Sequence, residues 1–326
     1  MNVFVAGATG ALGRQLVPRL VARGHEVVGM TRSASKQDLV RSLGARPVVA
    51  DALDPDAVAQ AVASAEPEVI VHQLTALSGK MSIRDARHPD RSSMAIMTNR
   101  LRTEATDHLL AAGRAVGARR FVAQSFGAFR YARTGGPVQT EADPLDPDPP
   151  GALRPVVEAL LHLEEAVTTI DWGEGLALRY GGFYGPGTGI SLDPDAVMAG
   201  PIRKRRFPIV GDGGGVWSYV HIEDAAAATA IAVEHGQPGI YYIVDDDPAP
   251  VREMLPVLAS ALGAKPPRRI PRWLGRLAAG EMATLMMTEV RGASNEKAKR
   301  ELGWQLRYPS WRQGFAQGLG TSRGSG

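Results

Sequence analysis

The sequence contains no cysteine among its 326 residues. This absence excludes disulfides, thiolate metal sites and cysteine nucleophiles, and it agrees with the cytoplasmic location that we expect. No apolar run approaches the roughly 20 residues that a membrane-spanning helix needs. No basic segment precedes an apolar stretch at the N-terminus, so we expect no cleavable signal. The sequence therefore predicts a globular protein with no membrane partner.

Clustered metal ligands are also missing from the sequence. The seven histidines include no His-x-x-x-His pair, and the acidic triplet Asp245–Asp247 fits a solvated turn at a strand end. Ser125 lacks the flanking glycines of a nucleophile elbow, which argues against serine hydrolase chemistry. We expect neither a metal centre nor a serine nucleophile.

Acidic residues are slightly fewer than basic ones, so the net charge is +3 and the isoelectric point is about 9.2. Lysine occurs at only six positions, and the densest basic run, Arg203–Arg206, has no interleaved aromatic residue. We interpret this run as a solvated surface or a phosphate contact, and we expect no nucleic-acid partner.

The most informative motif lies in the first thirteen residues, MNVFVAGATGALG. An apolar strand leads into Gly7, Gly10 and Gly13, and a helical pattern follows as far as Gly24. Gly7 permits a sharp turn, Gly10 lets backbone N–H groups approach phosphates, and Gly13 lets the helix pack close to the sheet. A strand, a glycine turn and a helix in this order predict a dinucleotide site, with tight packing alone as the alternative.

Apolar strands alternate with helices through the first half of the sequence. We predict strands at 2–6, 25–30, 46–50, 68–72, 120–125 and 175–179, and helices at 55–65, 92–117 and 152–169. This alternation is typical of a parallel sheet covered by helices on both faces. We therefore predict a doubly wound, Rossmann-like α/β fold. Residues 1–180 and 212–245 would form the cofactor domain, and 181–211 and 246–326 a smaller substrate-binding region.

Ordered motifs extend this interpretation over nearly the whole chain. They are AGATGALG at 6–13, Asp51 at a strand end, VHQLTA at 71–76, Asn99, LRYGGFYGP at 178–186, GDG at 211–213, VHIED at 220–224 and KAKRELGW at 297–304. In these motifs the chain resembles the extended short-chain dehydrogenase/reductase superfamily, also called NAD-dependent epimerases/dehydratases. The resemblance implies a small-molecule substrate, bound at the carboxyl ends of the strands. Many members pair through helices beside the sheet, so a homodimer is the assembly to test.

The resemblance also implies which residues contact the cofactor. Gly10, Ala11 and Leu12 would lie under the pyrophosphate, Asp51 and Ala52 near the adenine, and Leu74, Thr75 and Ala76 along the remainder. With the neighbouring positions and the end of the second strand, the predicted cofactor set is Gly7, Thr9, Gly10, Ala11, Leu12, Gly13, Arg32, Ser33, Asp51, Ala52, Leu74, Thr75, Ala76 and Tyr180.

The end of the second strand predicts which dinucleotide is bound. Residues 27–35 contain no Asp or Glu, whereas a free ribose 2′-hydroxyl favours an acidic partner there. Arg32 can form two hydrogen bonds to a 2′-phosphate, with Ser33 beside it. We expect NADP(H) to be preferred over NAD(H); if Arg32 instead stacks on the adenine, either cofactor fits.

The usual catalytic pair of that superfamily is absent. Its members use a tyrosine and a lysine four residues later, on the helix that we predict at 152–169, and this segment contains neither. Val156 and Leu160, or the residues one position later, take the two places. Because the lysine helps to lower the pKa of the tyrosine, both parts of the proton relay are missing.

Three further positions depart from the family pattern. Phe126 stands where a serine or threonine commonly polarises the substrate, Gly182 replaces an asparagine, and Trp217 replaces an arginine that binds nucleotide-sugar phosphates. Phosphate recognition needs a cation, so a nucleotide-sugar substrate is disfavoured. The three residues predict a pocket that is more apolar and roomier.

Three functions are compatible with these observations. The first is an NADP(H)-dependent reductase or dehydrogenase of a small, fairly apolar carbonyl compound. Its displaced proton donor would be one of Ser125, Tyr131, Tyr180, Tyr184 and His221. The second is a non-redox isomerase, epimerase or lyase, and the third is a catalytically inactive protein that senses NAD(P).

Overall fold

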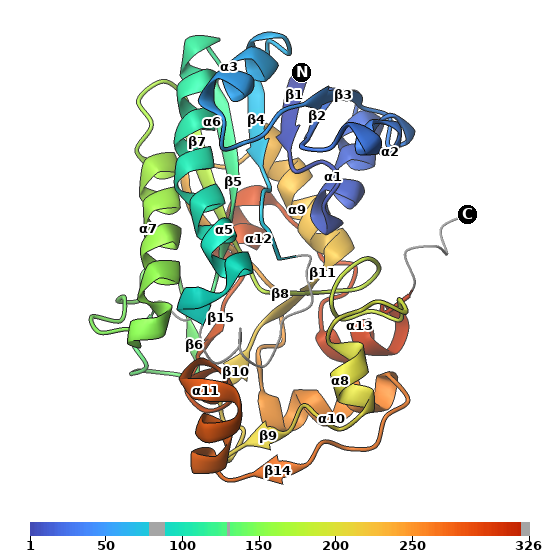
Figure 1. Ribbon diagram of the computed structural model, residues 1–326, viewed down its shortest axis with the longest axis vertical. Coiled ribbons are helices and arrows are strands. Elements are labelled where there is room, and N and C mark those ends of the chain that lie inside the picture. Colours follow the sequence, from blue (N-terminus) through green and yellow to red (C-terminus); the bar gives the residue numbers. More distant parts are fainter. Residues whose placement is uncertain (78–88, 129–130, 321–326) are drawn as a thin grey trace.

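The computed structural model describes residues 1–77, 89–128 and 131–320, and a parallel sheet lies at its centre (Figure 1). The strand order is β12-β7-β5-β4-β1-β2-β3, and every adjacent pair is parallel. The strands are β1 (Asn2–Ala6), β2 (Glu26–Thr31), β3 (Arg46–Val49), β4 (Val69–His72), β5 (Arg120–Phe126), β7 (Glu174–Tyr180) and β12 (Gly239–Ile243). The chain order reverses beside β1, and sheets of this kind bind ligands outside the carboxyl ends of the strands at such a point.

Helices cover both faces of the sheet because its central strands are apolar on both sides. Val3 and Val5 pack with α1, whereas Phe4 and Ala6 pack with α3 on the opposite face. The first face is covered by α1 (Ala11–Ala22), α2 (Gln37–Ser42), α9 (Ile222–Glu234) and α12 (Glu296–Leu302). The second is covered by α3 (Pro55–Ala63), α5 (Ser93–Arg102), α6 (Glu104–Ala115) and α7 (Arg154–Thr168). The predicted doubly wound fold is confirmed.

A smaller region with its own apolar cluster extends below the sheet in Figure 1. Its helices are α8 (Ala199–Arg203), α10 (Val251–Ala261), α11 (Arg272–Thr288) and α13 (Trp311–Gln317). Short strand pairs lie within this region or between it and the loops above. They are β8 (Gly182–Tyr184) with β11 (Tyr219–His221), β9 (Ile209–Val210) with β14 (Arg269–Ile270), β10 (Val216–Trp217) with β13 (Ala249–Pro250), and β6 (Val138–Gln139) with β15 (Gly292–Ala293). Helix α11 is interrupted at Gly280, which has φ 89° and ψ 179°.

The predicted strands lie within about a residue of the observed ones, but the single helix predicted over 92–117 is wrong. The chain bends at Thr103, with φ −100° and ψ −80°, and this bend separates α5 from α6. The hydroxyls of Thr98, Thr103 and Thr106 each donate to the carbonyl four residues earlier. Such back-bonding threonines compete with the helical hydrogen bonds and bend helices.

The segment 212–245 contributes to both parts of the molecule. Its strand β12 completes the sheet beside β7 and its helix α9 packs on α1, but its strand β10 pairs with β13 of the smaller region. The division into two domains stays a prediction. Among the helices of the described residues, none combines the length and the apolarity that crossing a bilayer requires.

Candidate functional site

The turn between β1 and α1 forms a cradle for an anion. Gly7 has φ +97°, and a Cβ there would lie 2.8 Å from the carbonyl oxygen of Gln73. A Cβ at Gly13 would lie 2.3 Å from the carbonyl oxygen of Gly7, so only glycine lets α1 approach β1 this closely. Gly10 precedes α1 without a side-chain cap, which leaves the first N–H groups of the helix available to a ligand. These residues fit the pyrophosphate of a dinucleotide.

Two arginines lie on segments next to this cradle. Arg32 is exposed just after β2, and within the described ranges its guanidinium makes no hydrogen bond or ion pair. Ser33 follows it, with its Oγ 2.8 Å from the Oγ of Ser35. Arg14, which sequence reasoning missed, donates from Nε to the Thr9 carbonyl at 3.0 Å. Its place in the first turn of α1, directly after Gly13, was the signal that could have revealed it.

The other predicted cofactor residues lie at the same edge of the sheet. Asp51 is exposed after β3, and its carboxylate accepts from the Leu53 N–H at 3.1 Å, while Ala52 beside it is buried. Leu74–Ala76 follow β4 and are half-buried, with the Ala76 N–H donating to Thr98 Oγ1 at 3.2 Å. The fold therefore brings together the segments predicted to hold the cofactor.

Two buried polar residues, His72 and Gln73, lie at the carboxyl end of β4 beside these segments. His72 Nε2 lies 3.1 Å from the Leu101 carbonyl oxygen and 3.1 Å from Thr106 Oγ1, and burial lowers its pKa to about 4. The Gln73 amide is buried beside the Tyr180 hydroxyl and makes no well-formed hydrogen bond with a described residue. A buried amide of this kind is a group that a bound ligand would satisfy.

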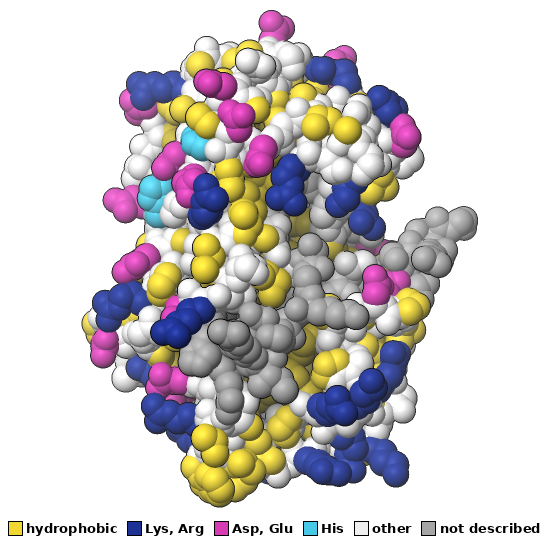
Figure 2. Space-filling model, in the orientation of Figure 1, with side chains coloured by type: hydrophobic (Ala, Val, Ile, Leu, Met, Phe, Trp, Pro, Cys, Tyr) yellow, Lys and Arg dark blue, Asp and Glu magenta, His cyan; other side chains and the backbone are white. Residues whose placement is uncertain are grey.

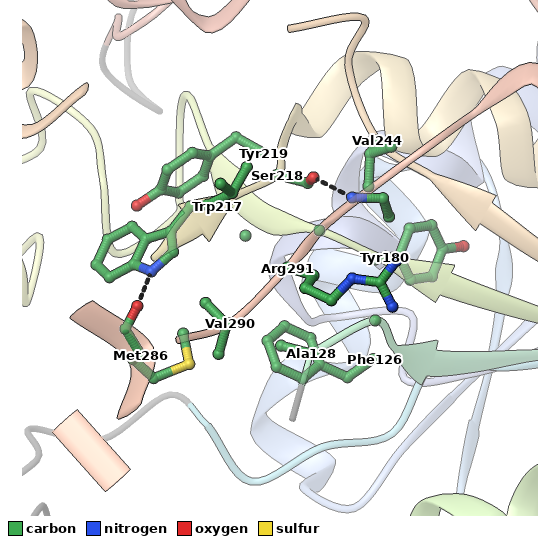
Figure 3. A pocket seen from close by; sticks show the side chains of 15 residues that line it. Phe126, Ala128, Tyr180, Trp217, Ser218, Tyr219, Val244, Met286, Val290 and Arg291 are labelled. Atoms are coloured by element: carbon green, nitrogen blue, oxygen red, sulfur yellow. Dashed lines mark hydrogen bonds between the residues drawn. The ribbon is translucent and has the colours of Figure 1, made fainter. Parts of the chain in front are cut away.

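A cavity of about 110 Å³ lies beyond the carboxyl ends of β5 and β7 (Figure 3). Large apolar side chains form most of its wall, namely Phe126, Trp217, Tyr219, Met286 and Val290. Trp217 Nε1 donates to the Met286 carbonyl at 2.6 Å, which fixes the indole ring against α11. The apolar character predicted from Phe126 and Trp217 is therefore present.

The extra room predicted from Gly182 is not available. A Cβ at Gly182 would lie 2.6 Å from Cε1 of Tyr219, so the ring of Tyr219 fills the space that a larger residue would take. Arg291 also lines the cavity, but its guanidinium donates to the carbonyls of Gly136 and Val138 and pairs with Asp143 at 2.7 Å. Its charge is thus already bound by the loop that precedes α7.

The helix that carries the usual catalytic pair holds a buried ion pair instead. Val156 is half-buried and Leu160 is fully buried on α7. One turn later, Glu164 accepts hydrogen bonds from Arg179 Nε at 2.9 Å, from Arg179 Nη2 at 2.7 Å and from Ser125 Oγ at 2.5 Å. Ser125 is 1% exposed and does not line the cavity, so its hydroxyl belongs to this network.

The tyrosines predicted as proton donors occupy different surroundings. The Tyr180 ring lines the cavity, but its hydroxyl lies 2.6 Å from Thr229 Oγ1 and burial raises its pKa. Tyr184 is fully buried away from the cavity, pressed against Gly314, and burial followed by the charge of Asp245 raises its pKa.

Tyr131 and His221 are also buried. The Tyr131 hydroxyl makes no hydrogen bond with a described residue, and its ring lines a second, smaller cavity that shares Val290 and Arg291 with the first. His221 Nε2 lies 2.9 Å from the Gly318 carbonyl oxygen, and burial lowers its pKa. Of the five predicted donors, all of them described residues, Tyr180 contributes to the wall of the larger cavity.

Asp245 is buried, so the prediction of a solvated turn at 245–247 is wrong for this residue. It follows β12 and is 1% exposed, because the smaller region covers this end of the sheet. Its Oδ2 has no hydrogen-bond partner among the described residues. Burial, with smaller contributions from the charges of Asp247 and Asp246, raises the pKa of Asp245 to about 8.

We expect Asp245→Asn to stabilise the protein at alkaline pH. Since the folded pKa of about 8 exceeds the unfolded value of about 3.9, the native state binds the extra proton between these values. Wild-type stability then falls as pH rises from about 4 to about 8 by an amount of the order of a few kcal/mol. Thermal unfolding should show a variant advantage that grows over this range. An advantage that is constant with pH would contradict the assignment.

The chain is similar to several known proteins. Residues 3–244 match the NAD dependent epimerase/dehydratase family. A 3-diazoavenalumate denitrifying reductase from Streptomyces sp. is 45% identical over 320 residues, which are 97% of this chain and 100% of that protein. A 2-alkyl-3-oxoalkanoate reductase from Stenotrophomonas maltophilia (strain K279a) is 28% identical, over 95% of this chain and 91% of that protein.

Solved structures agree with the fold. The UDP-glucose 4-epimerase of Thermus thermophilus, in complex with NAD, has a TM-score of 0.72 and 25% identity, with 100% of both chains covered. The similarity to named reductases and to an NAD-bound epimerase supports an oxidoreductase of the short-chain dehydrogenase/reductase type with a nicotinamide cofactor. The chain belongs to the NAD-dependent epimerase/dehydratase family.

Proposed function

We propose that the protein is an NADPH-dependent reductase that removes a diazo group from an aromatic ring as dinitrogen. The observation that carries this proposal is the apolar replacement of the proton relay, Val156 and Leu160 on α7, in a full-length relative of a denitrifying reductase. An acceptor that needs no proton from the protein fits a site from which the usual donor is missing.

The chemistry explains why the acceptor matters. A bound reduced nicotinamide cofactor supplies a hydride, that is, one proton and two electrons. A carbonyl group that accepts hydride becomes an alkoxide and must be protonated. An aryl diazonium group that accepts hydride carries a positive charge, so the sum Ar–N₂⁺ + H⁻ → Ar–H + N₂ balances without an acid. The carbon–nitrogen bond breaks and a carbon–hydrogen bond replaces it.

The residues of the cavity supply binding and orientation. Phe126, Trp217 and Tyr219 present flat apolar surfaces, and a volume of about 110 Å³ suits one aromatic ring better than a nucleotide sugar. The rings of Trp217 and Tyr219 meet edge to face with their centroids 6.0 Å apart, which gives an aromatic substrate a rigid apolar wall to pack against.

A second candidate is reduction of a small apolar ketone, as for the 2-alkyl-3-oxoalkanoate reductase relative. The buried Tyr131 hydroxyl, which has no hydrogen-bond partner among the described residues, favours it because a ketone needs a proton donor. Tyr131 would then be the displaced acid of the site.

Turnover measurements separate the two candidates. We would supply NADPH with an aryl diazonium salt or with a panel of ketones, and follow cofactor oxidation and dinitrogen release by mass spectrometry. The first candidate requires one dinitrogen per NADPH. Turnover of ketones alone contradicts it, and NADPH binding without any turnover favours a cofactor sensor.

The variant Tyr131→Phe adds a test of the proton donor. We expect diazo turnover to change less than about twofold, whereas ketone reduction that uses Tyr131 should fall by about 10²-fold. Tyr308→Phe is the control, because its hydroxyl lies outside both cavities. A large loss of diazo turnover in Tyr131→Phe would show that an acid is needed after all.

We also propose that Arg32 and Ser33 select NADP(H) through its 2′-phosphate. Arg32→Asp is expected to weaken NADPH binding by about 10- to 100-fold, the value of losing a charged hydrogen bond, and to change NADH binding far less. Calorimetric titration of both cofactors measures this. Arg41→Asp on α2, whose arginine pairs with Asp38 at 2.7 Å, is the control. An equal loss of both cofactors in Arg32→Asp would contradict the assignment.

A further inference from the structure

Two basic segments that lie far apart in the sequence meet on one surface. The run Arg203–Arg206 begins at the last residue of α8, and a second group occurs within 265–276. The second group consists of Lys265, Arg268, Arg269, Arg272 and Arg276. Strand β9 follows the first segment and pairs with β14 in the second. Arg205 Nε also donates to the Pro266 carbonyl at 3.0 Å, so the two segments are held side by side.

The positive charge of this surface is largely unbalanced. Residues 199–211 and 260–280 contain no Asp or Glu. Arg272 pairs with Glu289, and Arg276 pairs with Glu281 at 3.0 Å. The remaining basic side chains make no ion pair within the described part of the chain, and they are Arg203, Lys204, Arg205, Arg206, Lys265, Arg268 and Arg269.

Large apolar side chains are exposed beside these charges. Trp273 is 68% exposed and Leu277 is 64% exposed, one turn apart on the first half of α11. Gly275 lies between them and packs directly on β9, since a Cβ there would lie 2.4 Å from Cγ1 of Val210. The helix therefore turns its buried side to the strand pair and these residues outward. Figure 2 shows hydrophobic side chains gathered at the lower end of the molecule, with Lys and Arg side chains beside them.

We propose that this surface, formed by α11, β14 and the end of α8, docks onto an anionic lipid membrane. Trp and Leu favour the boundary between headgroups and acyl chains, while flanking Lys and Arg bind lipid phosphates. Each basic side chain near an anionic leaflet contributes on the order of a fivefold factor to partitioning. A second copy of this chain is a poor partner, because two such basic surfaces repel each other. The proposal is independent of the reaction catalysed, and it departs from the prediction, made from the sequence, of no membrane partner.

Vesicle flotation with the full chain tests this proposal. Vesicles of phosphatidylcholine with phosphatidylglycerol should bind the protein, vesicles of phosphatidylcholine alone should not, and high salt should release it. On the anionic vesicles the emission of Trp273 should shift to shorter wavelength, and Trp273→Phe should lose this shift while still binding.

Matched variants separate this surface from the general positive charge of the protein. Trp273→Ala with Leu277→Ala, and separately Arg268→Glu with Arg269→Glu, should each reduce the bound fraction at least tenfold. The controls are Ile96→Ala, which changes an exposed apolar residue on α5, and Arg114→Glu with Arg119→Glu, which make the same change in net charge elsewhere.

Three outcomes would overturn the proposal. One is no flotation with the anionic vesicles even at low salt. Another is an equal loss of binding in the control variants, which would indicate unspecific charge attraction. The third is tighter binding to a DNA or RNA duplex than to vesicles, with the same dependence on Arg268 and Arg269, which would identify a nucleic-acid surface instead.

Discussion

Replacing Glu164 with glutamine is expected to lower the free energy of unfolding by about 3–5 kcal/mol. The side chains of Glu164 and Arg179 are each 4% exposed, and Glu164 binds both Arg179 and Ser125. Glutamine keeps the shape of the side chain but removes the charge that balances a buried guanidinium. Arg179 would retain the rings of Tyr131 and Tyr242, at 5.2 and 5.4 Å, which do not replace a carboxylate.

Chemical denaturation of the wild type and of the variant measures this difference. Glu165→Gln is the control, since Glu165 is exposed on the same helix and should change stability by less than about 0.5 kcal/mol. If Glu164→Gln does not fold, the milder Ser125→Ala should still cost about 1–3 kcal/mol through the lost hydrogen bond. A loss below about 1 kcal/mol in Glu164→Gln would mean that the pair does not organise this part of the fold.

Replacing Gly13 with alanine is expected to weaken NADPH binding by at least about 100-fold, or about 2.7 kcal/mol. Its Cβ would lie 2.3 Å from the Gly7 carbonyl oxygen and 2.6 Å from that of Ala8. Both contacts are with backbone, so α1 must move away from β1, and its N-terminal N–H groups move away from the phosphates with it. The same overlap should cost about 1–3 kcal/mol of stability.

Calorimetric titration and thermal unfolding give the two quantities separately. Gly200→Ala in α8 is the control, because a Cβ there meets nothing within 4 Å and its helical position favours alanine. Unchanged NADPH affinity in Gly13→Ala would remove the β1–α1 turn from the proposed cofactor site, whatever happens to stability.

The sheet and the glycine turn after β1 could be predicted because their signals are local. The run from Asn2 to Ala6 is a buried parallel strand, and the glycines that follow it have steric reasons that hold in any chain. The bend at Thr103 was harder to predict, since threonine hydroxyls bend a helix only when they turn back to its carbonyls. The burial of Asp245 depends on residues far from it in the chain, such as Tyr184, Tyr219 and Trp311, so its own neighbours gave no sign of it.

The wall of the larger cavity could not be assembled from the sequence for a similar reason. Met286 and Val290 lie more than a hundred residues from Phe126, and their proximity follows from the way the smaller region folds back over the sheet. The three family positions Phe126, Gly182 and Trp217 predicted an apolar character. The space left by Gly182 was filled by Tyr219, a residue that no motif had singled out.

The interruption of α11 at Gly280 divides the helix into an outer half that is exposed and an inner half that reaches the cavity. Trp273 and Leu277 precede the break, and Met286 in the cavity wall follows it. Because the helical hydrogen bonds are not continuous across Gly280, tilting the outer half does not oblige the inner half to rotate. Substitutions in the half proposed to dock on a membrane and substitutions in the half that lines the cavity can therefore act independently of each other.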